Sequence, residues 1–341
     1  MLNYTIRRLV LAVPTLLFIS LIIFLVVALS PSDPTASLPL SIPSEVREQI
    51  REALGFNEPI YVRYWLWLKT FIVNEPRYYL QDIFGWSYDA STHPRVISWQ
   101  TRSPVMDTIT QRVPQTLWVV GMSYIVGILI ALPIGIISAY KQYSIFDQIG
   151  TFVSMIGFSV PTFFTGVLLI VIFSVIVPTD SWFWLPSIYD TTHEVTDLSS
   201  FWFQVKQMIM PVAVLALYNA AQISRFMRAS MLDNLNQDYV RTARAKGLTE
   251  KVVVLVHVLR NSLIPVITVI ALGVPQIFGG AIITEQVFKV NGLGQLLIIA
   301  IQDGDAPTVQ TLTFIFAILI VLFNLIADLL YGILDPRIRY D

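Results

Sequence analysis

Six long apolar stretches divide this sequence. An α-helix rises about 1.5 Å per residue, so roughly 20 apolar residues are needed to cross a bilayer core of about 30 Å. Segments of this kind run approximately over residues 9–29, 117–140, 149–177, 208–226, 263–284 and 309–333. The pattern therefore predicts an all-α polytopic membrane protein with six transmembrane helices.

The segments between these stretches predict three parts. Residues 1–30 form an N-terminal anchor helix, because the apolar run is longer than that of a signal peptide and no A-x-A cleavage site follows it. Residues 31–115, which we call the cap segment, are too long for a bare connection and should have their own structure. Residues 116–341 form a five-helix core that includes a long polar loop, residues 228–260.

Basic residues predict the side of the membrane on which each loop lies, since Lys and Arg accumulate in short cytoplasmic loops and flanks. With both termini inside, the cytoplasmic side holds Arg7, Arg8, Arg337 and most of the other basic residues of the flanks and short loops. The two short outer loops hold only Lys206 and Lys289. We therefore expect a multi-pass membrane protein with both termini in the cytoplasm and the cap segment outside.

Two elements of the cap segment can be predicted. Ser44 follows a proline and precedes an acidic residue, which is typical of a helix N-terminus, and an apolar stripe leads from it to a stop at Gly55. The aromatic stretch from Tyr61 to Leu68 is typical of a membrane interface. Packing of this stretch on the spans is favoured over a substrate site, because such aromatic belts are a general membrane feature.

Composition excludes several kinds of function. Of the 341 residues, 55% are hydrophobic and 13% are charged, whereas a soluble domain has about 25% charged residues. The 22 basic and 23 acidic residues exclude a nucleic-acid binder that neutralises phosphates. No cysteine is present, and the three histidines lack the spacing of a metal site. The sequence also lacks a phosphate-binding P-loop, so we expect no catalytic residue, no metal and no cofactor on this chain.

The 228–260 loop is polar and rich in helix-forming residues. Asp238 is expected to cap a helix that runs to Ala245, and Gly247 to end it in a left-handed conformation. Glu250 is expected to open a second helix. The loop should therefore form two short helices split by a glycine, a protrusion that is expected to have a function beyond covering the helix bundle.

The same region resembles the EAA loop of ABC-importer permeases, in the version of the dipeptide, oligopeptide and nickel group. The general pattern is E-A-A, three residues, glycine, nine residues and I-x-L-P. In residues 238–266 the letters RTA at 241–243 stand in the E-A-A places and Gly247 in that of the glycine. HVLR at 257–260 replaces I-x-L-P, and the proline comes later, at Pro265, as in the peptide group.

Other segments are similar to the same group, and the chain is identified as the first permease of the pair, the oligopeptide permease B type. The segments are MLNYTIRRLVLAVPTLL at the start, REALGFNEPIYVRYW in the cap segment, 82–87, 103–105, 290–294, 303–307 and 335–339. Between Trp86 and Ser103 the chain is longer than the group's pattern, so the fold and role of residues 88–102 stay open.

The resemblance implies a type I ABC-importer permease fold and a non-catalytic subunit that forms half of a pathway for peptides. It implies a second homologous permease, two ATPase subunits that bind ATP and Mg, and an external solute-binding protein as partners, in a bacterial or archaeal cell membrane. The residues expected to couple to the ATPase are Asp238, Arg241, Thr242, Ala243, Arg244, Gly247 and Leu248. Gly247→Leu or Ala243→Trp is expected to uncouple transport and leave the spans folded.

Polar and helix-breaking residues inside the spans predict the solute path, because such residues are costly against lipid. Ser159 and Pro161 lie in the third span, where the proline is expected to kink the helix. Asn219 and Gln222 share one face of the fourth span, and Pro275 lies in the fifth. The glycines of the fifth span fit close helix packing at least as well as solute contact.

Two alternatives remain beside a peptide permease. A permease of the same group for nickel chelates or oligosaccharides would share every feature described so far. A secondary transporter driven by an ion gradient would need buried acids on several spans and an internal repeat. The candidate acid in the spans is Asp328, near the inner end of the sixth span. It is expected to pair with a basic residue or reach the interface.

Overall fold

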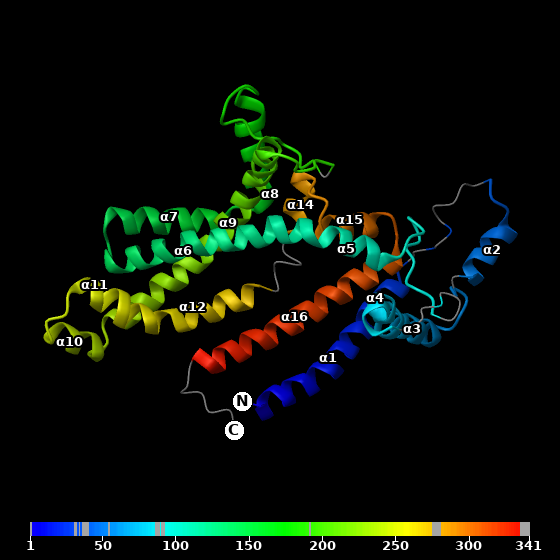
Figure 1. Cartoon of the computed structure of the whole chain (residues 1–341), viewed down its shortest axis with the longest axis horizontal. Coiled ribbons are helices and arrows are strands. Elements are labelled where there is room, and N and C mark those ends of the chain that lie inside the picture. Colours follow the sequence, from blue (N-terminus) through cyan, green and yellow to red (C-terminus); the bar gives the residue numbers. More distant parts are fainter. Residues whose placement is uncertain are drawn as a thin grey trace. The chain divides into compact units, whose positions relative to one another are not determined.

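A computed structural model describes residues 2–30, 33, 35, 41–53, 55–85, 89, 93–190, 192–274 and 281–334. Within these residues the structure is helical, and the extended pairing is limited to one antiparallel bridge between Ile97 and Pro104. Five helices are long and apolar enough to cross a membrane, or up to six if a bent helix pair counts as one span (Figure 1). The prediction of an all-α protein with six apolar spans is confirmed.

The described helices are labelled in chain order in Figure 1. Short π-helical segments continue some of them without a break: η1 (Thr70–Asn74), η2 (Leu117–Gly121), η3 (Val171–Ile176) and η4 (Val253–Val258). The α-helices are α1 (Leu2–Ala28), α2 (Ser44–Ala53), α3 (Ile60–Lys69), α4 (Glu75–Phe84), α5 (Val105–Thr116), α6 (Met122–Tyr140), α7 (Ile145–Ser159), α8 (Thr162–Ile170), α9 (Leu198–Leu235), α10 (Asp238–Ala245), α11 (Glu250–Val252), α12 (Leu259–Gly273), α14 (Ile282–Phe288), α15 (Leu293–Gln302) and α16 (Ala306–Leu334).

The third span is broken, where the sequence predicts a single kinked helix. α7 ends at Ser159, α8 begins at Thr162, and the two helix axes differ by 101°. Val160 has an extended backbone, with φ −81° and ψ 126°. The ring of Pro161 disfavours a helical conformation at the residue before it and removes one backbone donor, which explains the break.

Several helices extend beyond the apolar stretches that predict them. The second span begins at Val105 rather than near 117, and the fourth extends from Leu198 to Leu235. The fifth runs from Glu250 to Gly273, so the predicted stretch 263–284 marks neither of its ends. Polar residues can continue a helix outside the hydrocarbon, and hydropathy alone therefore misplaces helix ends. The short helices α14 and α15, between the fifth and sixth spans, have no counterpart among the predicted spans.

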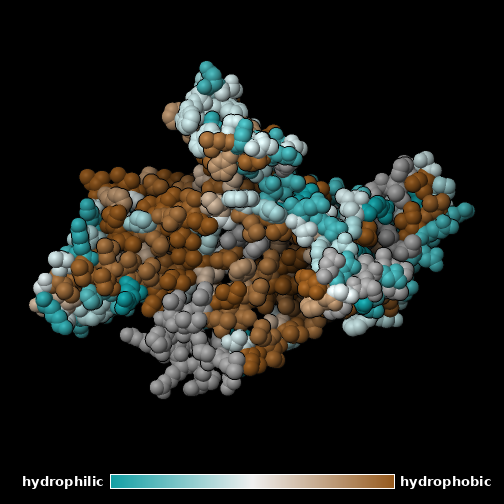
Figure 2. All heavy atoms as spheres, viewed as in Figure 1, coloured by the Kyte–Doolittle hydropathy of each residue, from teal (hydrophilic) through white to brown (hydrophobic). Residues whose placement is uncertain are grey.

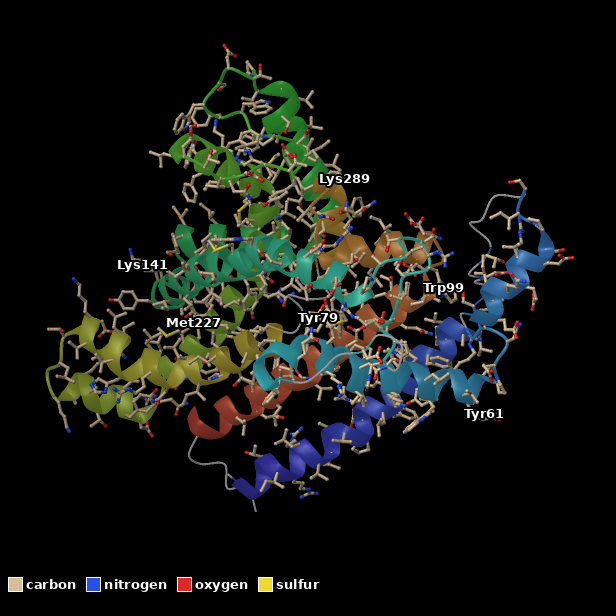
Figure 3. All side chains as sticks on the ribbon, turned by 45° about the vertical axis from the view of Figure 1, so that its right-hand side comes forward. Tyr61, Tyr79, Trp99, Lys141, Met227 and Lys289 are labelled. Atoms are coloured by element: carbon tan, nitrogen blue, oxygen red, sulfur yellow. The ribbon has the colours of Figure 1, made fainter. Side chains whose placement is uncertain are left out.

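The chain divides into two compact units. The first contains residues 1–9, 115–295 and 320–341, and the second contains residues 10–114 and 296–319. In the first unit α9 packs lengthwise on α6, and Met227, labelled in Figure 3, is fully buried there. Gly127 and Gly135 of α6 face α9 at close range. Small residues allow two membrane helices to approach closely, so these positions determine the α6–α9 distance.

Gly135→Ala should therefore destabilise the first unit by about 1–3 kcal/mol, the usual cost of overpacking. A Cβ at position 135 would lie 2.6 Å from the Cβ of Met227 and 2.7 Å from the carbonyl oxygen of Ser224. Thermal unfolding in detergent would show a lower midpoint. Gly121→Ala is the matched control, because no heavy atom lies within 4 Å of the added Cβ. Equal midpoints for the two variants would contradict this account.

In the second unit the predicted amphipathic helix is confirmed as α2, and Gly55 has the left-handed φ of +65°. The aromatic stretch forms α3, in which Trp67 is buried while Tyr61 is 75% exposed (Figure 3). The Trp67 ring lies 6.1 Å from that of Phe24 on α1 and 5.5 Å from that of Phe314 on α16. These contacts support the packing interpretation of the aromatic stretch.

The segment 303–307 begins α16 and holds the cap segment to it within the second unit. The buried carboxylate of Asp305 accepts hydrogen bonds from the hydroxyls of Ser98 and Thr308, at 2.5 and 2.7 Å, and from the backbone N–H of Trp99 at 2.9 Å. Ser98 and Trp99 belong to residues 88–102, whose fold the sequence leaves open. The later half of that segment is therefore ordered by a buried acid at the start of the last span.

Candidate functional site

The 228–260 loop is shorter than the sequence suggests, because helices extend into it from both sides. α9 continues to Leu235, and the next span begins at Glu250. The interval contains α10, from Asp238 to Ala245, as predicted. The loop is therefore one short helix held between two long ones.

Asp238 does not cap α10, and that prediction is wrong. Gln237 takes the N-cap position without a side-chain hydrogen bond, so Asp238 already lies in the first turn. Its carboxylate accepts a long hydrogen bond of 3.5 Å from Arg241. A negative charge in the first turn still favours the helix dipole, and the side chain is 96% exposed.

Gly247 ends α10 as predicted. Its φ is +77°, a left-handed conformation that costs side-chain-bearing residues free energy. The N–H of Gly247 donates to the carbonyl of Arg244 at 3.0 Å, and the N–H of Leu248 donates to that of Ala243 at 3.4 Å. This pair of bonds satisfies the last carbonyls of the helix and is the Schellman arrangement.

The inner face of α10 packs on its own chain. Val240 is fully buried and Ala243 is 6% exposed, in one cluster with Met227 of α9 and with Val253 and Val258 of η4. Ala243 therefore faces the loop's own core, away from any partner. Ala243→Trp would overpack this core and displace α10, so its effect on transport would not report a partner contact.

The second predicted helix of the loop is not a separate element. From Glu250 the chain continues through η4 into α12, as one helix that reaches Gly273. Arg244 and Glu250 form an ion pair of 2.7 Å across the Gly247 turn, and the hydrogen bond from Arg244 to Glu250 raises the pKa of Arg244. α10 is therefore tied directly to the start of the fifth span.

The outer face of α10 is charged and accessible. The Arg241 side chain is 74% exposed and that of Arg244 is 43% exposed. Thr242 is exposed beside them, and Leu248, 40% exposed, adds an apolar contact next to the turn. Figure 2 shows hydrophilic side chains gathered at the loop end of the first unit, next to the hydrophobic surface of its spans. An exposed surface that combines arginine side chains with a neighbouring apolar side chain is suited to contact with a protein partner.

Of the predicted path residues, Asn219 and Gln222 lie one helical turn apart on α9. Both are half-buried, and neither side chain makes a hydrogen bond to any described residue. Asn219 lies against α6, where a Cβ on Gly127 would be 3.0 Å from its own. Ser159 and Pro161 lie at the α7–α8 break and are exposed, and Pro275 lies outside the described residues.

The predictions from sequence did not include Glu285, a buried acid of the first unit. Glu285 of α14 is 1% exposed and accepts hydrogen bonds of 3.0 Å from the hydroxyl of Thr116 and from the N–H of Gln295. A Cβ on Gly292 would lie 2.3 Å from one Glu285 oxygen, and one on Gly294 would lie 3.0 Å from the other. Gly292 and Gly294, in the segment 290–294, leave room for this carboxylate. They were the sequence signal that could have indicated a side chain packed closely against this turn.

Two further ion pairs join helices of the first unit among the described residues. Arg228 of α9 binds Asp147 of α7 through two hydrogen bonds of 2.6 and 2.8 Å, with the Asp147 side chain 4% exposed. Arg8 of α1 lies 3.0 Å from Asp328 of α16, and both side chains are partly exposed. The expectation that Asp328 pairs with a basic residue is confirmed.

Known proteins are similar to this chain along nearly its whole length. Residues 131–340 match the family model "Binding-protein-dependent transport system inner membrane component", and residues 1–120 match the N-terminal model of the same system. The oligopeptide transport system permease protein AppB of Bacillus subtilis (strain 168) is 38% identical over 342 residues, 99% of each chain. The glutathione transport system permease protein GsiC of Escherichia coli (strain K12) is 35% identical over 341 residues, 100% of each chain.

Among solved structures, a chain of an amino acid ABC transporter with histidines has a TM-score of 0.46 and 15% sequence identity, covering 68% of this chain and 95% of its own. The assignment to a family rests on the two family models and on the relatives that align over their full length, and it agrees with the apolar spans. The chain belongs to the family of binding-protein-dependent transport system inner membrane components, as a permease of the ABC importers.

Proposed function

We propose that this chain forms half of the membrane pathway of an ATP-driven importer for peptides. The observation that supports it most is its similarity, over the full length of both chains, to permeases named for oligopeptide and glutathione transport. A pathway for a peptide needs more than one such chain, so a second, related permease completes it. An external binding protein delivers the solute, and nickel chelates or oligosaccharides are the alternative cargo.

The outer face of α10 is the proposed contact with an ATPase subunit. Arg241, Arg244 and Thr242 are exposed there, and Gly247 and Leu248 form the adjoining turn. Charged and polar side chains on a short rigid helix can fit a groove in a partner. Asp238 contributes from the first turn, while Ala243 supports the helix from inside.

α10 is connected directly to the fifth span, so a movement of α10 can be transmitted to that span. The Arg244–Glu250 ion pair connects α10 to a helix that continues to Gly273 without interruption. Val240 and Val253 also pack in one buried cluster. A push on α10 therefore shifts the start of the fifth span as a rigid body, which is how we propose that ATP binding in the partner reaches the pathway.

This chain supplies no catalytic group in the proposed mechanism. ATP and Mg bind to the two ATPase subunits, and the permease only transmits their closure and opening. The proposal places the chain in the inner membrane as a multi-pass protein with both termini and the 228–260 loop in the cytoplasm. The solute passes along polar groups in the spans, of which Asn219 and Gln222 are our candidates.

Replacing both path candidates by leucine should slow import. Asn219→Leu with Gln222→Leu removes two amides that make no hydrogen bond to described residues and could contact a polar solute. We expect a loss of about three- to tenfold in uptake, the cost of one or two solute hydrogen bonds. Uptake of a labelled peptide into proteoliposomes measures it, with basal ATPase activity as the check on assembly. Unchanged uptake would remove these two residues from the path.

The proposed function is tested by purifying the tagged chain from its host in mild detergent and identifying what accompanies it. A second permease with ATPase subunits is the expected result. The isolated complex should import a peptide into liposomes only when ATP is supplied to the ATPase side. A lone chain that transports on an ion gradient would contradict the proposal, and import of a nickel chelate or oligosaccharide in place of peptide would change the cargo.

A further inference from the structure

The second unit contains a half-open cavity of about 370 Å³ that the proposed transport mechanism does not use. Its walls come from the last turn of α1, from α3, from residues 94–99 and from the first turns of α16. Aromatic side chains line it, including Phe56, Trp67 and Trp99, and Trp99 is labelled in Figure 3. All of these residues belong to one compact unit, so the cavity is a property of that unit alone.

Arg63 of α3 places an unpaired cation in this cavity. Its guanidinium lies 4.5 Å from the centre of the Phe56 ring and forms no ion pair with any described residue. The positions between 31 and 92 that lie outside the described residues include no Asp or Glu. The Arg63 side chain is half-buried, and this burial lowers its pKa. A desolvated cation without a counter-ion is unfavourable, so the site favours an anion.

The second cation at the cavity, Arg95, is different because it is already neutralised. Its guanidinium lies 2.9 Å from Glu75 and 2.8 Å from Asp107 and stacks on the Tyr78 ring at 3.9 Å. Arg95 and its two carboxylates together offer no positive charge, so the positive charge available to a ligand comes from Arg63.

Two further polar groups in the cavity wall lack partners. Trp67 is 8% exposed, and its indole N–H has no hydrogen-bond acceptor among the described residues. Gln310 of α16 is 6% exposed, and its side-chain amide makes no hydrogen bond to any residue in the described part of the chain. Buried donors are almost always satisfied in native proteins. An acceptor with several oxygens, such as a phosphate, would satisfy Trp67, Gln310 and Arg63 together.

The position of the cavity along the spans indicates where that phosphate comes from. Its walls include Phe24 and Val27 at the end of one membrane helix and Pro307 at the start of another. Leu66, also in the wall, is 49% exposed, and its neighbour Trp65 is 63% exposed. Span ends with exposed aromatic side chains lie at the level of lipid headgroups. We propose that this cavity binds one phospholipid, with its phosphate on Arg63 and an acyl chain along the apolar wall.

Native mass spectrometry of the purified full-length protein tests the proposal with three probes. Phosphatidylglycerol carries both phosphate and acyl chains, diacylglycerol carries only the chains, and glycerol 3-phosphate carries only the phosphate. We expect one tightly bound phosphatidylglycerol and no comparable binding of the other two. Arg63→Gln should weaken that binding about tenfold, because a charge-assisted contact is lost.

Two variants separate the site from general effects of charge and folding. Lys69→Gln removes the same charge from an exposed position on the same helix and should bind phosphatidylglycerol like the wild type. Trp67→Phe keeps an aromatic ring at this buried position but removes the indole N–H together with the five-membered ring, so it should still fold and bind more weakly. The proposal is wrong if Arg63→Gln and Lys69→Gln bind alike. Equal binding of diacylglycerol would overturn it in favour of an apolar pocket, and equal binding of glycerol 3-phosphate in favour of a soluble-anion site.

Discussion

Gly247→Leu should lower solute import about tenfold while the spans remain folded. The backbone at Gly247 has φ +77°, and a left-handed conformation costs a side-chain-bearing residue about 1–2 kcal/mol. Because no heavy atom lies within 4 Å of a Cβ at this position, the cost comes from the backbone and not from a clash. The α10 turn would populate its present conformation about tenfold less, and ATPase closure would reach the spans correspondingly less often.

Import and ATPase activity of the reconstituted importer measure this effect. Gly247→Asn is the matched control, because asparagine tolerates the left-handed conformation better than leucine does. It should keep most of the import. Wild-type import by Gly247→Leu would show that the turn is not part of the coupling.

A second pair of variants separates the turn from the surface that it positions. Arg241→Glu reverses a charge that is 74% exposed and whose one ion pair with a described residue, Asp238, is long, at 3.5 Å. It should uncouple transport with no change in unfolding temperature if α10 meets an ATPase. Lys251→Glu makes the same change at an exposed position outside α10 and should leave import intact. Equal import by the two variants would move the contact away from the outer face of α10.

Asp147→Asn should destabilise the first unit by about 2–3 kcal/mol. The Asp147 side chain is 4% exposed and accepts two hydrogen bonds from Arg228 and one from the backbone N–H of Tyr143. Removing one partner of a buried ion pair leaves the other charge without compensation. The loss stays below the largest values known for such pairs, because Arg228 is 28% exposed and can be partly rehydrated.

Asp328→Asn provides the comparison within the same unit. It breaks the pair with Arg8, in which both side chains are partly exposed, and such pairs contribute about 1 kcal/mol or less. Thermal unfolding in detergent should therefore show a clear drop in midpoint for Asp147→Asn and a small one for Asp328→Asn. The opposite order would mean that the α7–α9 ion pair does not hold the two helices together.

The most reliable predictions from sequence rest on local chemistry. The apolar stretches predict the membrane spans because a span's length and hydropathy reside in consecutive residues. Gly55 and Gly247 are found in the left-handed conformation, as their position after a helix predicts. The Asp238 prediction failed by one residue for a local reason too, since capping and first-turn acids leave similar signals.

The sequence by itself therefore determined the class of protein, its spans, the helix at 238–245 and the glycine that ends it. Tertiary structure decided what these elements contact. Ala243 turns inward to a buried cluster that includes Val258, Arg228 binds Asp147 eighty-one residues away, and Glu285 binds Thr116 across 169 residues. Such pairings depend on how whole helices pack. The sequence pattern of one helix does not show which face of another helix lies against it. The same packing makes one continuous helix from Glu250 to Gly273, where the local pattern suggests two.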